Sequence, residues 1–252
     1  MSISGLREWK EKMRSGTVTV GAVISLTDPT VAELAGYCGM DFIWIDSEHN
    51  AFNMESIKNL IISARAGGSA PLVRVRANDS NLIKPVLDMA PAGVIIPMVN
   101  SVEAAEAAVA ACKYPPVGIR GCGVRRAVGY GSIDFETYLS ASQHEPWVII
   151  QIEHIDAIHA LDDILKVPGV DSICIGPCDL SGSMGILNQM EDPKLNQILD
   201  EACAKVKAAG KILGTAAGDF PRWKARGVNW FAGASDWGGI AAGFRQLAQM
   251  KG

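Results

Sequence analysis

The sequence predicts a single (β/α)8 TIM barrel, and three observations favour this fold class. Eight short apolar runs alternate with segments of helical apolar spacing along the whole chain. The length of 252 residues is close to the roughly 250 residues of a typical barrel of this kind. No linker and no shift in composition indicates a second domain, so we expect residues 1–252 to form one. A doubly wound open sheet is the alternative, but it usually has fewer strands and a Gly-rich first turn.

Capping and turn residues set the expected boundaries of these elements. Pro29 suits the first turn of a helix and Gly39 its end, while Ser101 suits an N-cap. We expect strands at 18–25, 42–46, 72–75, 93–99, 148–153, 172–177, 211–215 and 230–234. We expect helices near the polar N-terminus, from Pro29, and at about 53–66, 80–89, 101–113, 155–165, 193–209, 220–226 and 240–250. The stretch 114–146 is too long for a simple crossover, and loops of that length are usually functional.

The composition is that of a globular chain, with 48% hydrophobic and 20% charged residues. A net charge of −4 gives no basic field for nucleic acid or for an anionic membrane. No run approaches the roughly 18–20 apolar residues that cross a bilayer. The six cysteines are scattered and form no C-x-x-C pair, which argues against a zinc ribbon or a redox motif. We therefore expect a cytoplasmic protein that binds neither nucleic acid nor membranes.

Two acidic residues follow the fifth and sixth expected strands. The stretch Trp147 to Leu180 contains the apolar runs VIIQIE and SICIGP, with Glu153 and Asp179 at their C-terminal sides. A segment of helical spacing connects the runs, and such a connection implies parallel neighbouring strands. Both carboxylates then emerge at the same edge of the sheet, where oxygen ligands suit a hard divalent cation. The alternative to this metal site is a pair of solvated loop acids.

Further polar residues follow the apolar runs and would share the C-terminal rim, where barrels of this kind place their active sites. The candidates are Asp46, Glu48, His49, Arg74, Arg76, Gln151, Ser181 and Asp236. A metal can polarise a carbonyl oxygen, an arginine can stabilise an oxyanion and a histidine can move protons. This combination favours enolate chemistry beside a carbonyl: aldol addition or cleavage, or decarboxylation of an oxo acid. In the alternative interpretation, Arg74 only pairs with an acid and His49 is an ordinary loop residue.

Two other features give weaker indications. His154 and His159 fall on different helix faces and do not resemble a metalloprotease pair, so we expect structural roles for both. The Gly-rich segment 118–131 follows no strong strand, which argues against a dinucleotide site. The segment contains three arginines, Arg120, Arg125 and Arg126. We expect them either to bind an anionic substrate end or a neighbouring subunit, or to belong to a solvated loop.

Five segments, in order, resemble the signature segments of one family. They are FIWIDSEHNAFN, PLVRVRAND, YPPVGIRGCG, VIIQIEHIDAI and GVDSICIGPCDLSGSMG. They resemble the HpcH/HpaI aldolases, which are metal-dependent class II pyruvate aldolases with macrophomate synthase-like relatives. The resemblance runs from about Gly21 to Gly239. It implies that Glu153 and Asp179 are metal ligands, usually for Mg²⁺ or Mn²⁺, with Co²⁺ also accepted.

The resemblance implies roles for other residues as well. His49, paired with Asp46, is implied to transfer protons through a metal-held water. Arg74 is implied to bind pyruvate and to stabilise its enolate. The implied substrate-binding residues are Arg74, Gln151, Gly176, Pro177 and Cys178, with backbone amides around 176–179 at the pyruvate carboxylate.

The implied reaction is reversible cleavage of a 4-hydroxy-2-oxo acid to pyruvate and an aldehyde, without a lysine Schiff base. An oxaloacetate decarboxylase or a citrate-lyase-type acyl-CoA lyase is the alternative, and a non-catalytic oxo-acid-binding protein is a more distant one. The family forms homohexamers, as trimers of dimers, that exchange the C-terminal helix, here at about 240–250. Two segments depart from the family pattern, CGVRRAVGYG and GTAAGDF. We expect them to face the aldehyde, where Arg125 and Arg126 suggest an anionic or hydroxylated acceptor.

Overall fold

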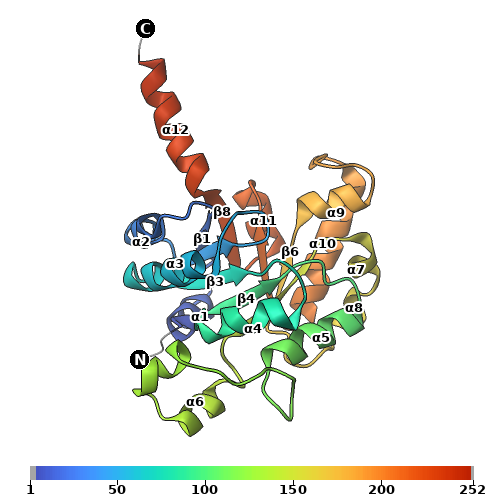
Figure 1. Ribbon diagram of the computed structural model, residues 1–252. Helices are drawn as coiled ribbons and strands as arrows, with labels where there is room; N and C mark the ends of the chain where they lie inside the picture. Colours follow the sequence, from blue (N-terminus) through green and yellow to red (C-terminus); the bar gives the residue numbers. More distant parts are fainter. Residues whose placement is uncertain (1–3, 251–252) are drawn as a thin grey trace.

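The computed structural model describes residues 4–250, in which eight parallel strands close into a barrel surrounded by helices (Figure 1). The strands are β1 (Thr19–Ile24), β2 (Phe42–Asp46), β3 (Ala70–Arg74), β4 (Gly93–Ile96), β5 (Trp147–Ile152), β6 (Ser172–Ile175), β7 (Ile212–Ala216) and β8 (Trp230–Ser235). Each strand pairs with the next in sequence, and β8 closes the barrel against β1. The predicted fold class, a single (β/α)8 TIM barrel, is confirmed.

Helices alternate with these strands. They are α1 (Leu6–Arg14), α2 (Pro29–Tyr37), α3 (Met54–Ala66), α4 (Ser80–Asp88), α5 (Val102–Cys112), η1 (Arg126–Gly131), α6 (Phe135–Ala141), α7 (Ile155–His159), α8 (Leu161–Ile164), α9 (Pro177–Ser183), α10 (Pro193–Ala208), α11 (Phe220–Arg226) and α12 (Asp236–Gln249). The expected helix at 155–165 is interrupted at Ala160, which separates α7 from α8. The short helices η1, α6 and α9 were not predicted, because their sequences lack a clear helical period.

Side-chain caps explain where several helices begin. The Asp28 carboxylate accepts a hydrogen bond from the Thr30 N–H at the start of α2, where Pro29 occupies the first turn. Ser101 caps α5 in the predicted way. The last helix, α12, begins at Asp236 and not near residue 240, because Ser235 accepts a hydrogen bond from the Gly238 N–H. No helix within residues 4–250 is both long and apolar enough to cross a membrane.

An aromatic cluster closes the N-terminal end of the barrel. Trp9, from α1, lies with its ring centroid 5.3 Å from those of Phe42 and Trp147 and 6.2 Å from that of Trp230. The indole N–H of Trp9 donates to the Thr19 hydroxyl at 2.9 Å. The strands contribute these rings at every second position, as expected for side chains that point into a barrel. Because this end is filled, a substrate can enter only at the C-terminal ends of the strands.

The segment from 114 to 146 lies at the N-terminal side of the barrel. Arg126 donates to the carbonyl oxygens of Met89 and Ala90, just beyond α4. Arg120 is buried and pairs with Asp88 at 2.8 Å. Figure 1 shows α6 on the opposite side of the barrel from α9 and α12. Arg126 therefore has a structural role, and the exposed Arg125 lies at the N-terminal side of the barrel, away from the C-terminal ends of the strands. Within one protomer, the expectation that this segment faces the aldehyde is not met.

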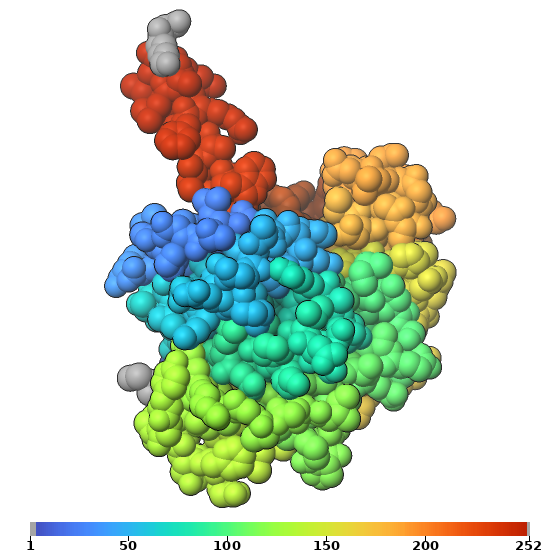
Figure 2. Space-filling model, in the orientation of Figure 1, coloured from blue at the N-terminus to red at the C-terminus, as the bar shows by residue number. Residues whose placement is uncertain are grey.

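Helix α12 projects from the barrel and leaves apolar side chains in solvent. Figure 2 shows it standing clear of the body of the molecule. The exposed apolar residues on it are Trp237, Ile240, Phe244, Leu247 and Met250, which are 43–77% exposed. A contiguous apolar face of this kind is typical of a protein–protein contact.

Candidate active site

A cavity of about 190 Å³ opens at the C-terminal ends of the strands. It is lined by Val23, Trp44, His49, Arg74, Gln151, Gly176, Pro177, Cys178, Asp179 and Ala216. Seven of the nine residues predicted from the sequence are in this lining, and the other two, Asp46 and Glu153, bond directly to members of it. A larger cavity of about 510 Å³ lies at the other end of the barrel, against α1 and α6. The residue types that line the smaller cavity, and not its volume, therefore identify it as the candidate active site.

Arg74 is held between two acids at the end of β3. Its Nε donates to Asp46 Oδ1 at 2.8 Å, and its Nη1 lies 3.0 Å from Glu48 Oε2. The parallel register places Asp46 directly opposite Arg74, so the first of these contacts follows from strand pairing. Burial alone would lower the pKa of Arg74, but the hydrogen bond that Arg74 donates to Asp46 and the charges of Asp46, Glu48 and Glu153 outweigh it and raise that pKa. The guanidinium is thus a fixed positive charge beside the cavity.

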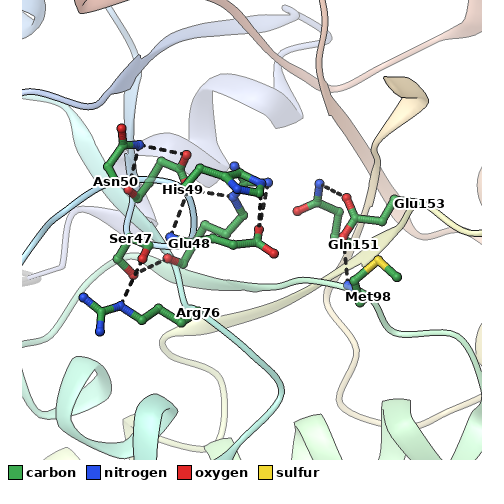
Figure 3. A network of polar contacts seen from close by, with 10 residues as sticks. Ser47, Glu48, His49, Asn50, Arg76, Met98, Gln151 and Glu153 are labelled. Carbon is green, nitrogen blue, oxygen red and sulfur yellow. Dashed lines mark hydrogen bonds and ion pairs between the residues drawn. The ribbon is translucent and has the colours of Figure 1, made fainter. Parts of the chain in front are cut away.

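Glu48 contacts two of the predicted site residues, Arg74 and His49, which the sequence did not indicate. Its Oε2 contacts Arg74 Nη1 and lies 3.7 Å from His49 Nε2, a contact that Figure 3 shows. Burial raises the pKa of Glu48, even though the charges of Arg74 and His49 act to lower it. The expected pairing of His49 with Asp46 is not what the structure shows. Asp46 is occupied by Arg74, by the Glu48 N–H and by the Asn50 side chain, so His49 lies against Glu48.

Glu153 is an almost fully buried carboxylate, only 2% exposed. Its Oε1 accepts from the Met98 N–H at 2.8 Å, and its Oε2 accepts from the Gln151 side-chain amide (Figure 3). Met98 has φ 54°, an uncommon conformation outside glycine that is found at constrained functional positions. The Glu153 carboxylate lies close to the backbone of Gly176, and only glycine allows this, because a Cβ at residue 176 would lie 2.7 Å from Glu153 Oε2. Gln151 and Glu153, two positions apart at the end of β5, thus lie on the same face, as strand alternation requires.

The environment of Glu153 fits a bound cation. The pKa of Glu153 is raised to about 7: burial is the largest cause, the charges of Glu48 and Asp179 act in the same direction, and the Met98 N–H and the charge of Arg74 oppose them. A carboxylate that is desolvated and close to other acids is stabilised by a positive ion. Asp179, in the first turn of α9, lines the same cavity. Residues 4–250 contain no group of three or more His, Cys, Asp or Glu that could hold a metal. The fit to a cation rests on Glu153 and Asp179 alone, whose carboxylate oxygens are the ligand type that a hard divalent cation prefers.

Several candidates from the sequence have structural roles instead. Arg76 donates to the backbone oxygens of Ser47 and Phe52 and so holds the loop after β2. Asp236 accepts hydrogen bonds from Ser25 and Leu26, so it ties the start of α12 to the segment after β1. The third is Ser181, whose hydroxyl donates to the Cys178 carbonyl. His154, for which a structural role was expected, caps α7.

Three cavity residues escaped the sequence analysis: Val23, Trp44 and Ala216. Trp44 precedes Asp46 by two positions in a buried strand, so strand alternation could have placed both on the inner face. Val23 and Ala216 are small apolar residues in apolar runs, and nothing in their sequence context distinguishes them from core residues.

A closed barrel with a cationic arginine and a pair of carboxylates at one strand-end cavity is typical of an enzyme that makes or breaks carbon–carbon bonds beside an oxo group. Residues 20–236 match the HpcH/HpaI aldolase/citrate lyase family. The chain belongs to this family, and it is an aldolase, a carbon–carbon lyase.

Relatives with known names agree with this assignment. The chain is 34% identical over 211 residues to the hydroxypyruvate/pyruvate aldolase of Roseobacter denitrificans, covering 83% of this chain and 82% of that protein. It is 35% identical over 208 residues to the 2-keto-3-deoxy-L-rhamnonate aldolase of Escherichia coli K12, covering 82% and 77%. The solved structure of citrate synthase SbnG superposes with a TM-score of 0.86 at 32% identity, covering 96% of each chain.

Proposed function

We propose that this aldolase reversibly cleaves a 4-hydroxy-2-oxo acid to an aldehyde and a three-carbon oxo acid, pyruvate or 3-hydroxypyruvate, with a divalent metal ion. Mg²⁺ or Mn²⁺ is the expected metal, and Co²⁺ the next candidate. One observation carries the proposal: the fixed positive charge of Arg74 and the desolvated carboxylate of Glu153, with Asp179 beside it, border one cavity. Such a cavity matches an oxo acid, whose oxo oxygen can accept from the arginine and whose oxygens can serve as ligands to a cation. The names of the relatives support the same substrate class.

The metal would be held by Glu153 and Asp179, and when bound it would supply a Lewis acid that polarises the oxo group. The hydrogen bonds from Met98 and Gln151 orient Glu153 for this task, as supporting contacts do around metal ligands. In the first turn of α9 the N–H groups of Cys178 and Asp179 have no acceptor within the helix, whereas the Gly176 N–H donates to the Ile152 carbonyl and Pro177 has no N–H. We assign the N–H groups of Cys178 and Asp179 to the carboxylate of the oxo acid, with Gln151, Gly176, Pro177 and Cys178 around it.

Arg74 stabilises the negative charge that develops on the C2 oxygen as the C3–C4 bond breaks. Its orientation is fixed by Asp46 and Glu48, so little reorganisation is needed during the reaction. His49 is 64% exposed at the mouth of the cavity, next to Glu48, and we assign to it the removal of the C4 hydroxyl proton, directly or through water. A proton delivered to C3 then completes the oxo-acid product.

We further propose that the protein is a cytoplasmic homo-oligomer, with the trimer-of-dimers hexamer as the expected form. The exposed apolar face of α12 supports this proposal, because an exchanged helix would bury it against a second copy. The free state of the cysteines in residues 4–250 agrees with a reducing compartment.

The experiment that tests the function measures pyruvate or hydroxypyruvate release from a panel of 4-hydroxy-2-oxo acids, with a coupled dehydrogenase reporting the product. Activity should be lost on adding EDTA and restored by Mg²⁺ or Mn²⁺. Release that is insensitive to EDTA would contradict the metal site. Decarboxylation of oxaloacetate without any aldol cleavage would instead support the alternative reaction.

A further inference from the structure

Two acids flank the Arg74 guanidinium, and they differ in how many hydrogen bonds their oxygens already accept. Asp46 Oδ1 accepts from Arg74 Nε at 2.8 Å and from the Glu48 N–H at 3.2 Å. Asp46 Oδ2 accepts from the Asn50 side chain at 3.0 Å. Glu48 Oε2 lies 3.0 Å from Arg74 Nη1 and 3.7 Å from His49 Nε2, but among the described residues it has no partner in hydrogen-bond geometry. Both oxygens of Asp46 are therefore engaged, whereas Glu48 Oε2 retains the capacity to accept a hydrogen bond.

The loop that carries Glu48 and His49 is tied firmly to its surroundings. The Ser47 N–H and hydroxyl both donate to a carbonyl at the end of β3. Arg76 donates to the carbonyls of Ser47 and Phe52, at 3.3 and 2.7 Å, and so joins the two ends of the loop. Figure 3 shows the Glu48 carboxylate facing the imidazole from this loop. The position of Glu48 next to His49 is therefore set by backbone contacts as well as by the side chains themselves.

Glu48 is the acid that a charged His49 would face. Among the described residues, no other acid forms an ion-pair contact with His49. An acid beside an imidazole stabilises its protonated form and fixes which nitrogen carries the hydrogen in the neutral form. A hydrogen on Nε2 faces Glu48, which leaves Nδ1 as the nitrogen that can take up a proton. The separation of 3.7 Å has to shorten by only about 0.8 Å for a hydrogen bond between the two side chains.

We propose that Glu48, and not Asp46, is the positioning residue that acts through His49 in the aldol cleavage. The C4 hydroxyl proton passes to His49 Nδ1, directly or through water. The electron pair of the O–H bond forms the carbonyl of the departing aldehyde, and the C3–C4 pair forms the enolate of the three-carbon oxo acid. Glu48 stabilises the resulting imidazolium at Nε2. The proton then leaves to water at the mouth of the cavity, where His49 is exposed.

This inference rests on the proposed function, and a double-mutant cycle tests it. The native protein, Glu48→Gln, His49→Ala and the double variant are compared with Mg²⁺ and the 4-hydroxy-2-oxo acid that the native protein cleaves fastest. The loss of kcat caused by Glu48→Gln should be about tenfold smaller in the His49→Ala background than in the native one, because the contact that it removes needs the imidazole. Equal losses in both backgrounds would overturn the proposal, since Glu48 would then act on Arg74 alone.

The matched control is Asp46→Asn, which also removes one carboxylate from Arg74 and keeps the shape of the side chain. Because Asp46 does not contact His49, its loss of kcat should be the same in the native and His49→Ala backgrounds. A coupling with His49 as large for Asp46→Asn as for Glu48→Gln would overturn the distinction between the two acids. Thermal unfolding of each variant shows that the kinetic losses belong to folded protein.

A second measurement needs no histidine variant. The ratio of kcat in H₂O to kcat in D₂O reports how far proton transfer limits the reaction. This ratio should be larger in Glu48→Gln than in the native protein, because the imidazolium is formed without its acid, and it should be unchanged in Asp46→Asn. A ratio that rises in Asp46→Asn and not in Glu48→Gln would overturn the proposal and assign the role to Asp46.

The outcomes for the reaction and for Glu48 can be told apart. Cleavage by the native protein, with equal losses for Glu48→Gln in both backgrounds, leaves the aldolase reaction in place and overturns only the role of Glu48. Absence of cleavage by the native protein with every 4-hydroxy-2-oxo acid contradicts the reaction itself, and the role of Glu48 is then overturned with it.

Discussion

The two ends of the barrel interior are made by the same strands but differ in how their polar groups are satisfied. At the N-terminal end, the indole N–H groups of Trp9 and Trp230 donate to side-chain hydroxyls. At the C-terminal end, the Trp44 N–H has no partner within residues 4–250, and burial raises the pKa of Glu153 to about 7. One end is complete without a ligand. The other end contains a desolvated carboxylate, Glu153, whose negative charge has no cation beside it except Arg74 among residues 4–250.

This difference separates two roles: residues at the N-terminal end of the barrel mainly stabilise the fold, and residues at the C-terminal end form the candidate active site. Aromatic packing and paired hydrogen bonds stabilise the folded chain in any solution. Desolvated charges and unpaired donors lower stability in the absence of ligand, and such departures are expected at functional sites. Substitutions at the two ends should therefore separate loss of activity from loss of stability.

The largest effect on activity is expected from Arg74→Ala. Removing the guanidinium takes away the group assigned to the developing oxyanion, and such groups contribute about 10²–10³ in rate. It also leaves Asp46 and Glu48 buried without their cation, which costs about 3 kcal/mol of unfolding free energy. Steady-state kinetics and urea unfolding measure the two losses. Arg74→Lys should recover part of the stability and less of the rate, because lysine keeps the charge but loses the fork between the two acids. Native-like turnover by Arg74→Ala would remove Arg74 from the reaction.

Glu153→Gln should weaken metal binding strongly and leave the metal-free protein as stable as the native one, or more stable. The reason is that burial penalises the charged form of Glu153, and the amide carries no charge. Isothermal titration with Mn²⁺ should show an affinity lower by about 10²-fold, in line with about 3 kcal/mol for one carboxylate ligand. The matched control is Asp171→Asn at the other end of the barrel. Burial also raises the pKa of Asp171, which accepts from the Val148 N–H, yet this variant should bind Mn²⁺ normally. Equal losses in both variants would contradict the assignment of Glu153 as a ligand.

At the closed end, Gly214→Ala should reduce stability without touching the site. A Cβ at residue 214 would lie 1.8 Å from Cε2 of Trp230, so the aromatic cluster would have to shift. Overpacking of this kind costs about 1–3 kcal/mol. Thermal unfolding should show a lower Tm, while Mn²⁺ affinity stays at the native value. A changed metal affinity with an unchanged Tm would mean that the two ends are not independent.

The regular part of this architecture could be predicted from the sequence because it follows from periodicity. The alternation of apolar runs with helical segments predicts the barrel. The register of the parallel strands β2 and β3 places Asp46 opposite Arg74. Strand alternation likewise placed Gln151 and Glu153 on one face, where they are hydrogen-bonded. These features depend on local geometry that repeats every two residues.

The remainder depends on contacts that no local pattern specifies. The partner of His49 is Glu48 and not Asp46, because Arg74 and Asn50 already occupy Asp46. The segment 114–146 packs beneath α4 through Arg126, a contact between distant parts of the chain. The unpaired N–H of Trp44 can be recognised only once every neighbouring acceptor is in place.

The smallest expected effect is a pH dependence of metal binding. The pKa of Glu153 in the folded, metal-free protein is about 7, above its ordinary value of 4.5. The neutral form therefore favours folding, and this contribution is full below about pH 4.5 and is lost as the pH rises through about 7. The metal requires the carboxylate, so protons compete with it below pH 7. The rise in Tm at a fixed Mn²⁺ concentration should grow between pH 5.5 and 7.5 and level off above pH 8. Glu153→Gln should abolish this dependence. A rise in Tm that is the same at pH 5.5 and pH 8 would show that Glu153 does not exchange its proton for the metal.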